Sequence, residues 1–531
     1  MSLVATDDRS VRLAGPPGLT STAKEHVGLG EYALLAVLIA AAVSSAGALL
    51  WQAISPHPLC GWGLIVDRLS ALLTLLVATV GAVTFRFSLR YLDGELGQAR
   101  FLRWLFLTVC GAYLLMLSTN LWLLFFAWLT VSLGLHELLV YYPDRPEALR
   151  PARKKFLISR LGDIALLSAI CLVGGHWGTW DVRTFLTVSP QASGPLATLV
   201  ALLVVAAALT KSAQFPFHSW LPETMEAPTP VSALMHAGII NAGGALLLRF
   251  APLLVRVPSA LFVLALVGTT TACLGLLAMW AQPNVKRTLA WSTVSQMGFM
   301  MAECGMAAFP VAALHIVGHG FYKAWSFLRT GDVPVRAASL FLSPRRTLFL
   351  AALGTGAGLA CVAGTARWAG LDLLRSPAEC GLSLILALSL GQVWVACFRA
   401  APAGPWQNAR ALASAVMASL FLSLLACGVY GGANAFLAPV FLAPASGLLP
   451  HSSGPLAWAS ALLPAVTLAA LCVLHPLLPV LMRTRSGRAF HIHALYGFYF
   501  GPIADRLVER VWHSPVRRNA PQKEQVCLTS K

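Results

Sequence analysis

Long apolar segments recur along the whole chain, and their length is the feature that most limits what it can fold into. By hydropathy they begin near residues 31, 64, 103, 119, 156, 196, 229, 258, 287, 309, 346, 382, 411 and 456. A helix needs about 20 consecutive apolar residues to cross the hydrocarbon core of a bilayer. The pattern therefore predicts an all-α polytopic membrane protein with about 14 transmembrane helices.

The composition argues against a soluble protein. Only 11% of the residues are charged and 57% are hydrophobic, whereas soluble proteins carry roughly 25% charged residues. The eleven cysteines include no C-x-x-C pair and mostly lie inside apolar segments. We therefore expect small buried thiols, and neither a disulfide framework nor a zinc site.

The net charge of +17 is compatible with nucleic-acid binding, so the positions of the charges decide the question. If the N-terminus is inside, 29 of the 38 Lys and Arg residues fall in inside segments and five in outside segments. Cytoplasmic loops of membrane proteins carry this excess. The asymmetry predicts a basic cytoplasmic membrane face, which includes the four cations at 150–155, and no nucleic-acid partner. It also predicts a cytoplasmic leader at 1–30, a transmembrane domain at 31–482 and a basic cytoplasmic tail at 483–531.

One segment combines a lysine with an unusual density of prolines. Lys211 follows the apolar run Leu196–Leu209, and the next residues contain Pro216, Pro222, Pro228 and Pro230. Proline removes backbone donors and breaks helices, and unpaired backbone at membrane depth must be buried in protein or line a wet cavity. The pattern predicts a lysine at a broken helix, as at the ion sites of transporters. The alternative is a lysine that snorkels from a helix end.

Histidines and a second lysine follow. His236 lies in the next apolar segment, where a structural hydrogen bond to a neighbouring helix is the alternative to a functional role. His315, His319 and Lys323 are spaced i, i+4 and i+8, so they share one stripe of a helix. Zinc is the rival explanation for H-x-x-x-H, but no third ligand follows at a suitable spacing. We predict no metal and no cofactor.

Acidic residues supply candidate counter-charges. Asp163 is three residues from Arg160, so the two can pair, or Asp163 can balance Lys211. Glu137 lies near the end of its segment, and its depth is left open. Glu303 is expected to be solvated at an outer helix end. Buried lysine and histidine exchange protons readily, so the residues predict a proton-relaying transporter subunit and no catalytic centre.

The stretch KSAQFPFHSWLPETMEAPTPVSALMH, from Lys211 to His236, closely resembles the signature of the antiporter-like subunits of respiratory complex I and of Mrp antiporters. The resemblance continues through 284–298 and 315–323, with upstream matches at 66–70 and 160–163. It implies a core at about 64–400 with two inverted five-helix repeats, each containing a broken helix. It also implies roles along a proton pathway, with Lys211 as the central lysine, His236 as its relay, His315, His319 and Lys323 leading onward, and Asp163 as a charge partner.

At two positions the chain departs from the family's pattern, and these departures indicate a particular branch of the family. The family has a glutamate directly after a tryptophan where this chain has Trp128-Leu129, and whether Glu137 replaces it is left open. The segment at 346–366 lacks the usual lysine, and Asp372 beyond it is a doubtful substitute. These features resemble the DabB branch, whose members pair with DabA, a soluble zinc protein similar to β-carbonic anhydrases.

The DabB resemblance implies a proton-conducting subunit of an energy-coupled inorganic carbon (CO2 or bicarbonate) transporter in a bacterial inner membrane. A DabA-like partner on the cytoplasmic face would carry out the carbon chemistry. The alternative function is a proton-translocating subunit of an NADH-quinone oxidoreductase or a Mrp-type cation/proton antiporter. A scaffold whose ionisable residues only hold helices together is a third reading.

Overall fold

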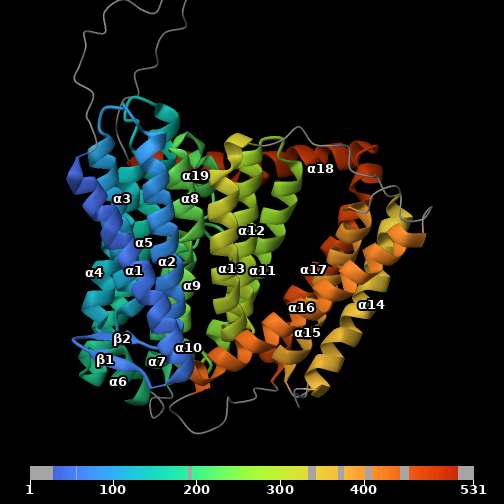
Figure 1. The fold of residues 1–531 in the computed structure, drawn as a ribbon, viewed down its shortest axis with the longest axis horizontal. Helices are drawn as coiled ribbons and strands as arrows, with labels where there is room; N and C mark the ends of the chain where they lie inside the picture. Colours follow the sequence, from blue (N-terminus) through green and yellow to red (C-terminus); the bar gives the residue numbers. More distant parts are fainter. Residues whose placement is uncertain are drawn as a thin grey trace, which may run out of the picture.

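The computed structural model describes residues 28–55, 57–188, 194–332, 343–368, 376–400, 409–442 and 454–511. Nearly all of the predicted leader, Asp372 and the end of the predicted tail lie outside these residues. The described part is an antiparallel bundle of helices, which confirms the all-α prediction (Figure 1). We call the end that carries α18 and α19 the upper face and the opposite end the lower face.

Most of the long helices run between these two faces. Their bounds are α1 Leu29–Ile54, α2 Arg68–Tyr91, α3 Gln98–Leu117, α4 Leu121–Leu139, α5 Pro146–Trp177, α7 Pro195–Lys211, α11 Pro258–Ala281, α12 Val285–Gly305, α13 Phe309–Leu328, α14 Pro344–Trp368, α15 Pro377–Ala400, α16 Ala409–Leu442 and α17 Pro455–Leu481. At the lower face lie the antiparallel hairpin β1 Leu59–Gly61 and β2 Leu64–Val66, the short helix α6 Val182–Val188 and the single turn α10 Ala251–Leu254.

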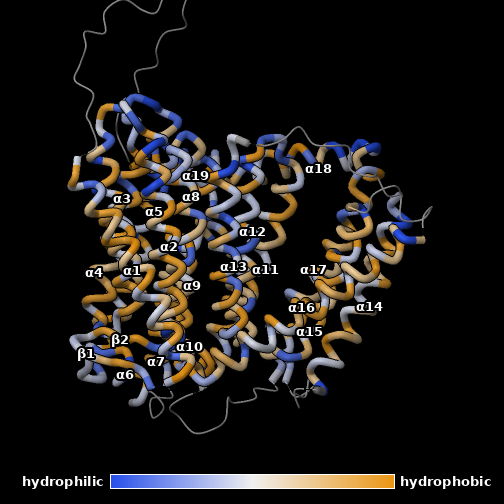
Figure 2. The backbone as a smooth tube through the Cα atoms, in the orientation of Figure 1, coloured by the Kyte–Doolittle hydropathy of each residue, from blue (hydrophilic) through white to orange (hydrophobic). Residues whose placement is uncertain are grey.

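The membrane prediction is supported by length and hydropathy. Within the described residues, eleven helices are long and apolar enough to span a bilayer, counting 229–249 as one. The other three predicted segments are also helical: α7 is only 17 residues long, and α12 and α13 carry more polar residues. Figure 2 shows hydrophobic residues through the middle of the bundle and hydrophilic residues gathered toward its ends.

The chain is interrupted after α7, within the proline-rich segment. Helix α7 ends at Lys211, and turns lead to the 3-10 segment η2 Leu221–Glu226. The next crossing is itself divided into α8 Thr229–Ala237, the 3-10 turn η3 Ile239–Asn241 and α9 Ala242–Arg249. Pro222 and Pro230 lie in first turns, where a missing backbone donor costs nothing. By contrast, α14 is one continuous helix.

Two helices of the predicted C-terminal tail lie along the upper face (Figure 1). They are α18 Arg485–Leu495 and α19 Phe500–Val511, joined by η5 Gly497–Tyr499. The Lys154 amine, with a side chain only 1% exposed, lies 2.6 Å from a Glu223 carboxylate oxygen and 2.7 Å from one of Asp505. Lys154, one of the basic residues of the predicted cytoplasmic face, is thus covered by α19, and this contact fixes α19 over the interrupted segment.

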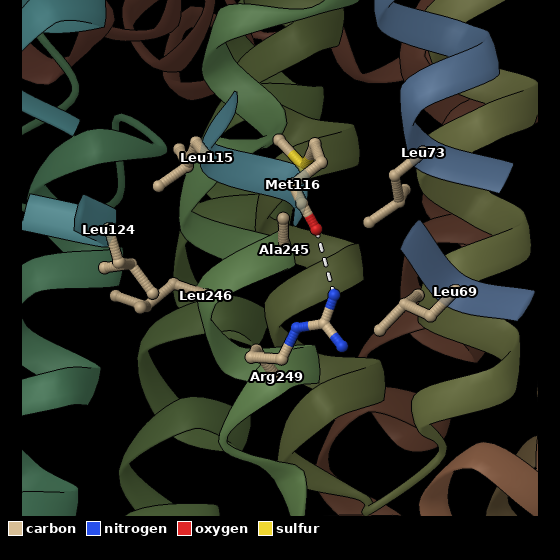
Figure 3. A pocket seen from close by; sticks show the side chains of 8 residues that line it. All are labelled: Leu69, Leu73, Leu115, Met116, Leu124, Ala245, Leu246 and Arg249. Atoms are coloured by element: carbon tan, nitrogen blue, oxygen red, sulfur yellow. Dashed lines mark hydrogen bonds between the residues drawn. The ribbon is translucent and has the colours of Figure 1, made fainter. Parts of the chain in front are cut away.

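An ion pair ties the lower end of α9 to the start of α2. Asp67 caps α2 by accepting a hydrogen bond from the Ser70 amide, and its second oxygen lies 2.7 Å from Arg249. Figure 3 shows Arg249 at a small pocket lined mostly by leucines, where it also donates to the Met116 carbonyl at 2.9 Å. One guanidinium therefore holds α9 against both α2 and the end of α3.

We predict that Arg249→Met lowers the free energy of unfolding by about 3–5 kcal/mol, because it leaves the Asp67 carboxylate buried without its partner. Thermal melting of the purified protein in detergent measures the change. Exposed Arg256 is the matched control, and Arg256→Met is expected to leave the melting temperature unchanged. Equal melting of the two variants would show that the pair contributes nothing.

Candidate functional site

The Lys211 amine lies inside the bundle, at the point where α7 ends. Its residue is 7% exposed, and the amine donates a 3.1 Å hydrogen bond to the Trp128 carbonyl of α4. The same amine lies 4.3 Å from the centroid of the Trp128 ring, a distance at which a cation is attracted to the π face. The side chain is therefore held within the protein and does not snorkel to a membrane surface.

Asp163 supplies the negative charge beside this lysine. The Trp128 indole N–H donates to one Asp163 oxygen at 2.8 Å, and Arg160 lies 2.7 Å from the other. Asp163 also lies within electrostatic range of Lys211. Asp163 thus pairs with Arg160, and Trp128 contacts both the Lys211 amine and the Asp163 carboxylate. We call Trp128, Lys155, Arg160, Asp163 and Lys211 the first cluster.

Lys155 is a member of this cluster that sequence reasoning missed. The charge asymmetry assigned it to the basic cytoplasmic face; the structure buries it, and its amine donates to the Ser132 carbonyl of α4 at 2.5 Å. It lies within electrostatic range of Lys211, Arg160 and Asp163. Pro146 was the sequence signal that could have predicted this burial. Proline favours the first turn of a helix, so a helix that begins there places Lys155 more than two turns inside α5.

Glu137 is not brought to the first cluster. It lies 2.7 Å from Arg100 near the upper end of α4, with its side chain 32% exposed. Nine residues separate it from Trp128, about 13.5 Å along a helix. Leu129, at the position of the family's glutamate, is partly buried against the apolar core. In this chain the Trp128 carbonyl and ring receive the lysine, so Glu137 has no direct part in holding it.

His236, His315, His319 and Lys323 come together from α8 and α13, and we call them the second cluster. The His236 ring stacks on Phe327 at 4.3 Å between centroids. His319 lies within electrostatic range of the other three. The Lys323 amine donates to the Leu289 carbonyl at 3.1 Å and to the Ser292 hydroxyl. The three titratable groups on one stripe of α13 thus lie close to His236 of α8.

The two clusters are connected through the chain interruptions. The Ser212 hydroxyl, directly after Lys211, donates to the Ile240 carbonyl in η3 at 2.7 Å. Among the described residues, the ring nitrogens of His236 and of His319 have no protein hydrogen-bond partner. Buried polar groups of this kind usually bind water. The first cluster therefore lies beside the end of α7 and the second beside the break at η3, and these two breaks are in contact. In the part of the chain that the structure describes, no direct hydrogen bond joins Lys211 to His236.

The prediction that Glu303 is solvated is wrong. The residue is 4% exposed, and its carboxylate lies 3.0 Å from Nδ1 of His315. Position near the end of α12 was a poor guide, because neighbouring helices cover that end. Within the described ranges, no three His, Cys, Asp or Glu side chains gather closely enough to hold a metal ion.

Comparison with known proteins agrees with this geometry. Residues 118–343 match the family model described as NADH:quinone oxidoreductase/Mrp antiporter, TM, and residues 58–102 match the N-terminal model of complex I chain 5. The chain is 36% identical, over 86% of its length and 82% of the relative's, to the "Probable inorganic carbon transporter subunit DabB2" of Halothiobacillus neapolitanus. The chain belongs to the DabB family.

Further relatives connect the DabB family to the antiporter-like subunits. A DabB of Hydrogenovibrio crunogenus is 42% identical over 50% of this chain and 52% of its own. The NADH-ubiquinone oxidoreductase chain 5 of Metridium senile is 36% identical over 51% of this chain and 46% of its own. The structure of the Mrp complex from Dietzia sp. DQ12-45-1b superposes with a TM-score of 0.52 at 27% identity, covering 91% of this chain and 56% of that one.

Gly243 permits the contact between the two breaks. A Cβ at this position would lie 2.5 Å from the Ala208 carbonyl oxygen and would clash with the Ser212 hydroxyl. We predict that Gly243→Ala lowers thermal stability in detergent by separating α9 from α7. The control is Gly318→Ala in α13, where a Cβ meets nothing within 4 Å; it should be neutral or stabilising by about 0.5–1 kcal/mol. Equal effects would contradict the close approach.

Proposed function

We propose that this chain is the proton-conducting membrane subunit of an inorganic carbon transporter and that it acts with a DabA-like zinc protein. The observation that carries the proposal is the Lys211 amine, buried at a helix break against Trp128 and beside Asp163. A buried lysine can release its proton because desolvation disfavours the charged form. Asp163 opposes that release, so the amine is suited to hold a proton and to pass it on.

The proposed route runs from the first cluster to the second. A proton leaves the Lys211 amine and crosses the contact between Ser212 and Ile240, where water can bridge the groups that have no protein partner. His236, His319 and Lys323 then exchange it, since histidine can both accept and donate at its two ring nitrogens. Each transfer leaves the donor one proton poorer and the acceptor one proton richer, so no other reactant is consumed.

We propose that the upper face is cytoplasmic and that the membrane is a bacterial inner membrane. The basic segments around Arg86–Arg103 and Arg485–Arg488 lie at that face, as the positive-inside rule requires. The DabA-like partner would bind there and carry the zinc that hydrates CO2 to bicarbonate and a proton. This subunit would then supply proton movement and would itself have no enzymatic activity.

A second candidate function is proton translocation in an NADH-quinone oxidoreductase or a Mrp-type antiporter. The match at 118–343 and the superposition on the Mrp complex favour it. The two functions share the proton route and differ in the partner. A neighbouring gene for a large zinc protein favours the first, and a run of quinone oxidoreductase genes favours the second.

We predict that Lys211→Met reduces uptake of labelled inorganic carbon by about 100-fold or more, the contribution typical of a positioned proton-transfer group. Methionine keeps most of the length of the side chain and removes the charge. Exposed Arg103→Met is the control for loss of a cation and should retain uptake. Membrane protein levels are matched by blotting. Full uptake by Lys211→Met at normal levels would refute the relay and leave the scaffold reading.

We also predict that a soluble subunit remains bound when the tagged, natively expressed chain is extracted in a gentle detergent. This subunit is expected to contain about one zinc ion per catalytic site, because the ligands of a carbonic-anhydrase-like enzyme hold a single metal ion. Elemental analysis of the copurified complex measures the zinc, and the tagged chain alone in a heterologous host is the control. Copurification of quinone oxidoreductase subunits without zinc would favour the second candidate instead.

A further inference from the structure

Three titratable side chains outside the predicted pathway interact with one another and with the second cluster. They are Glu303 of α12, Tyr430 of α16 and Glu379 of α15, and we call them the lower branch. Figure 1 shows α16 running obliquely from beside α14 and α15 toward the lower ends of α10 and α13. Contacts of α16 with α13, α15 and α2 agree with that path.

The lower branch begins at the second cluster. Glu303 and His315 are joined at 3.0 Å, and their side chains are only 5% and 12% exposed. A buried carboxylate is costly unless it is paired and hydrogen-bonded. His315 is also within electrostatic range of His319. Glu303 is therefore connected through His315 to the groups that receive protons in the proposed function.

Tyr430 continues this line toward α15. It is partly buried and lies within electrostatic range of both Glu303 and Glu379. A phenol can accept a proton on its oxygen while it gives up its own, so it can pass a proton without changing charge. Among the described residues, Oε2 of Glu379 is buried without a hydrogen-bond partner. That orphan oxygen can accept a proton, and it lies in the first turn of α15, at the lower end of the bundle.

We infer that Glu303, Tyr430 and Glu379 form the proton path between the second cluster and the lower face. The inference rests on the proposed function and adds three residues to it. A proton moves from His315 to the Glu303 carboxylate, then through the Tyr430 hydroxyl to Glu379. The branch supplies a route through the half of the molecule in which α14 is continuous and contains no lysine.

A structural role for the same residues makes a different prediction. If Glu303 served only to hold α12 to α13, glutamine would serve nearly as well, because its amide also hydrogen-bonds to histidine. Glutamine cannot titrate, however, whereas aspartate can. The pair Glu303→Gln and Glu303→Asp therefore separates proton transfer from packing.

The test measures proton flux into liposomes that contain the full-length chain, with an internal pH-sensitive dye and an imposed membrane potential. Glu303→Gln, Glu379→Gln and Tyr430→Phe are expected to lower the flux by about tenfold or more, and Glu303→Asp to retain part of it. Matched controls are Glu147→Gln at an exposed position and Tyr113→Phe, whose hydroxyl hydrogen-bonds to Ser45 of α1. Both controls should conduct like the unmodified chain.

The outcomes distinguish this inference from the proposed function. Wild-type flux in Glu303→Gln, Glu379→Gln and Tyr430→Phe, together with loss of flux in Lys211→Met, would overturn the lower branch and leave the proposed function standing. Normal flux in Lys211→Met would refute the proposed function itself. If Glu303→Gln fails to fold, Tyr430→Phe still decides the question, because it removes one partly buried hydroxyl and keeps the ring.

Discussion

The centre of the structure depends on the contacts of the Lys211 amine, which is buried beside Asp163. A cation at this depth must find electron-rich partners within the protein, and it finds the Trp128 carbonyl and ring. Because Asp163 accepts the Trp128 N–H and pairs with Arg160, α4, α5 and α7 are fixed relative to one another by one set of polar contacts. The helix break can exist here because these neighbours surround it.

Interruption of the backbone is what allows polar chemistry inside an otherwise apolar bundle. An intact helix satisfies its own donors and acceptors and presents only side chains. Where α7 ends and η3 divides the next crossing, backbone groups and Ser212 become available to each other. The same segment is covered from above by α19, since Lys154 pairs with both Glu223 and Asp505. The C-terminal helices are thus joined directly to the region that contains the first cluster.

The sequence predicted the spans well because a bilayer imposes a length and a composition that can be read one segment at a time. It also predicted that Lys211, His236, His315, His319 and Lys323 are unusual, since ionisable groups inside apolar runs are costly. It misjudged Glu303, which lies near the end of α12, and it did not predict that Lys154 and Lys155 are buried inside the bundle. Whether a helix end is solvated depends on which other element covers it, and hydropathy carries no information about that cover.

By itself, then, the sequence determined that this chain is a multi-pass helical membrane protein with a proline-broken, lysine-bearing segment, and its motifs pointed to the family. The tertiary structure decided which charges meet: that Trp128 receives the lysine, that Glu137 pairs with Arg100, and that Glu303 binds His315. The physical reason is that electrostatic partners are set by distances of a few ångströms between helices far apart in sequence. Such distances arise only when the helices pack.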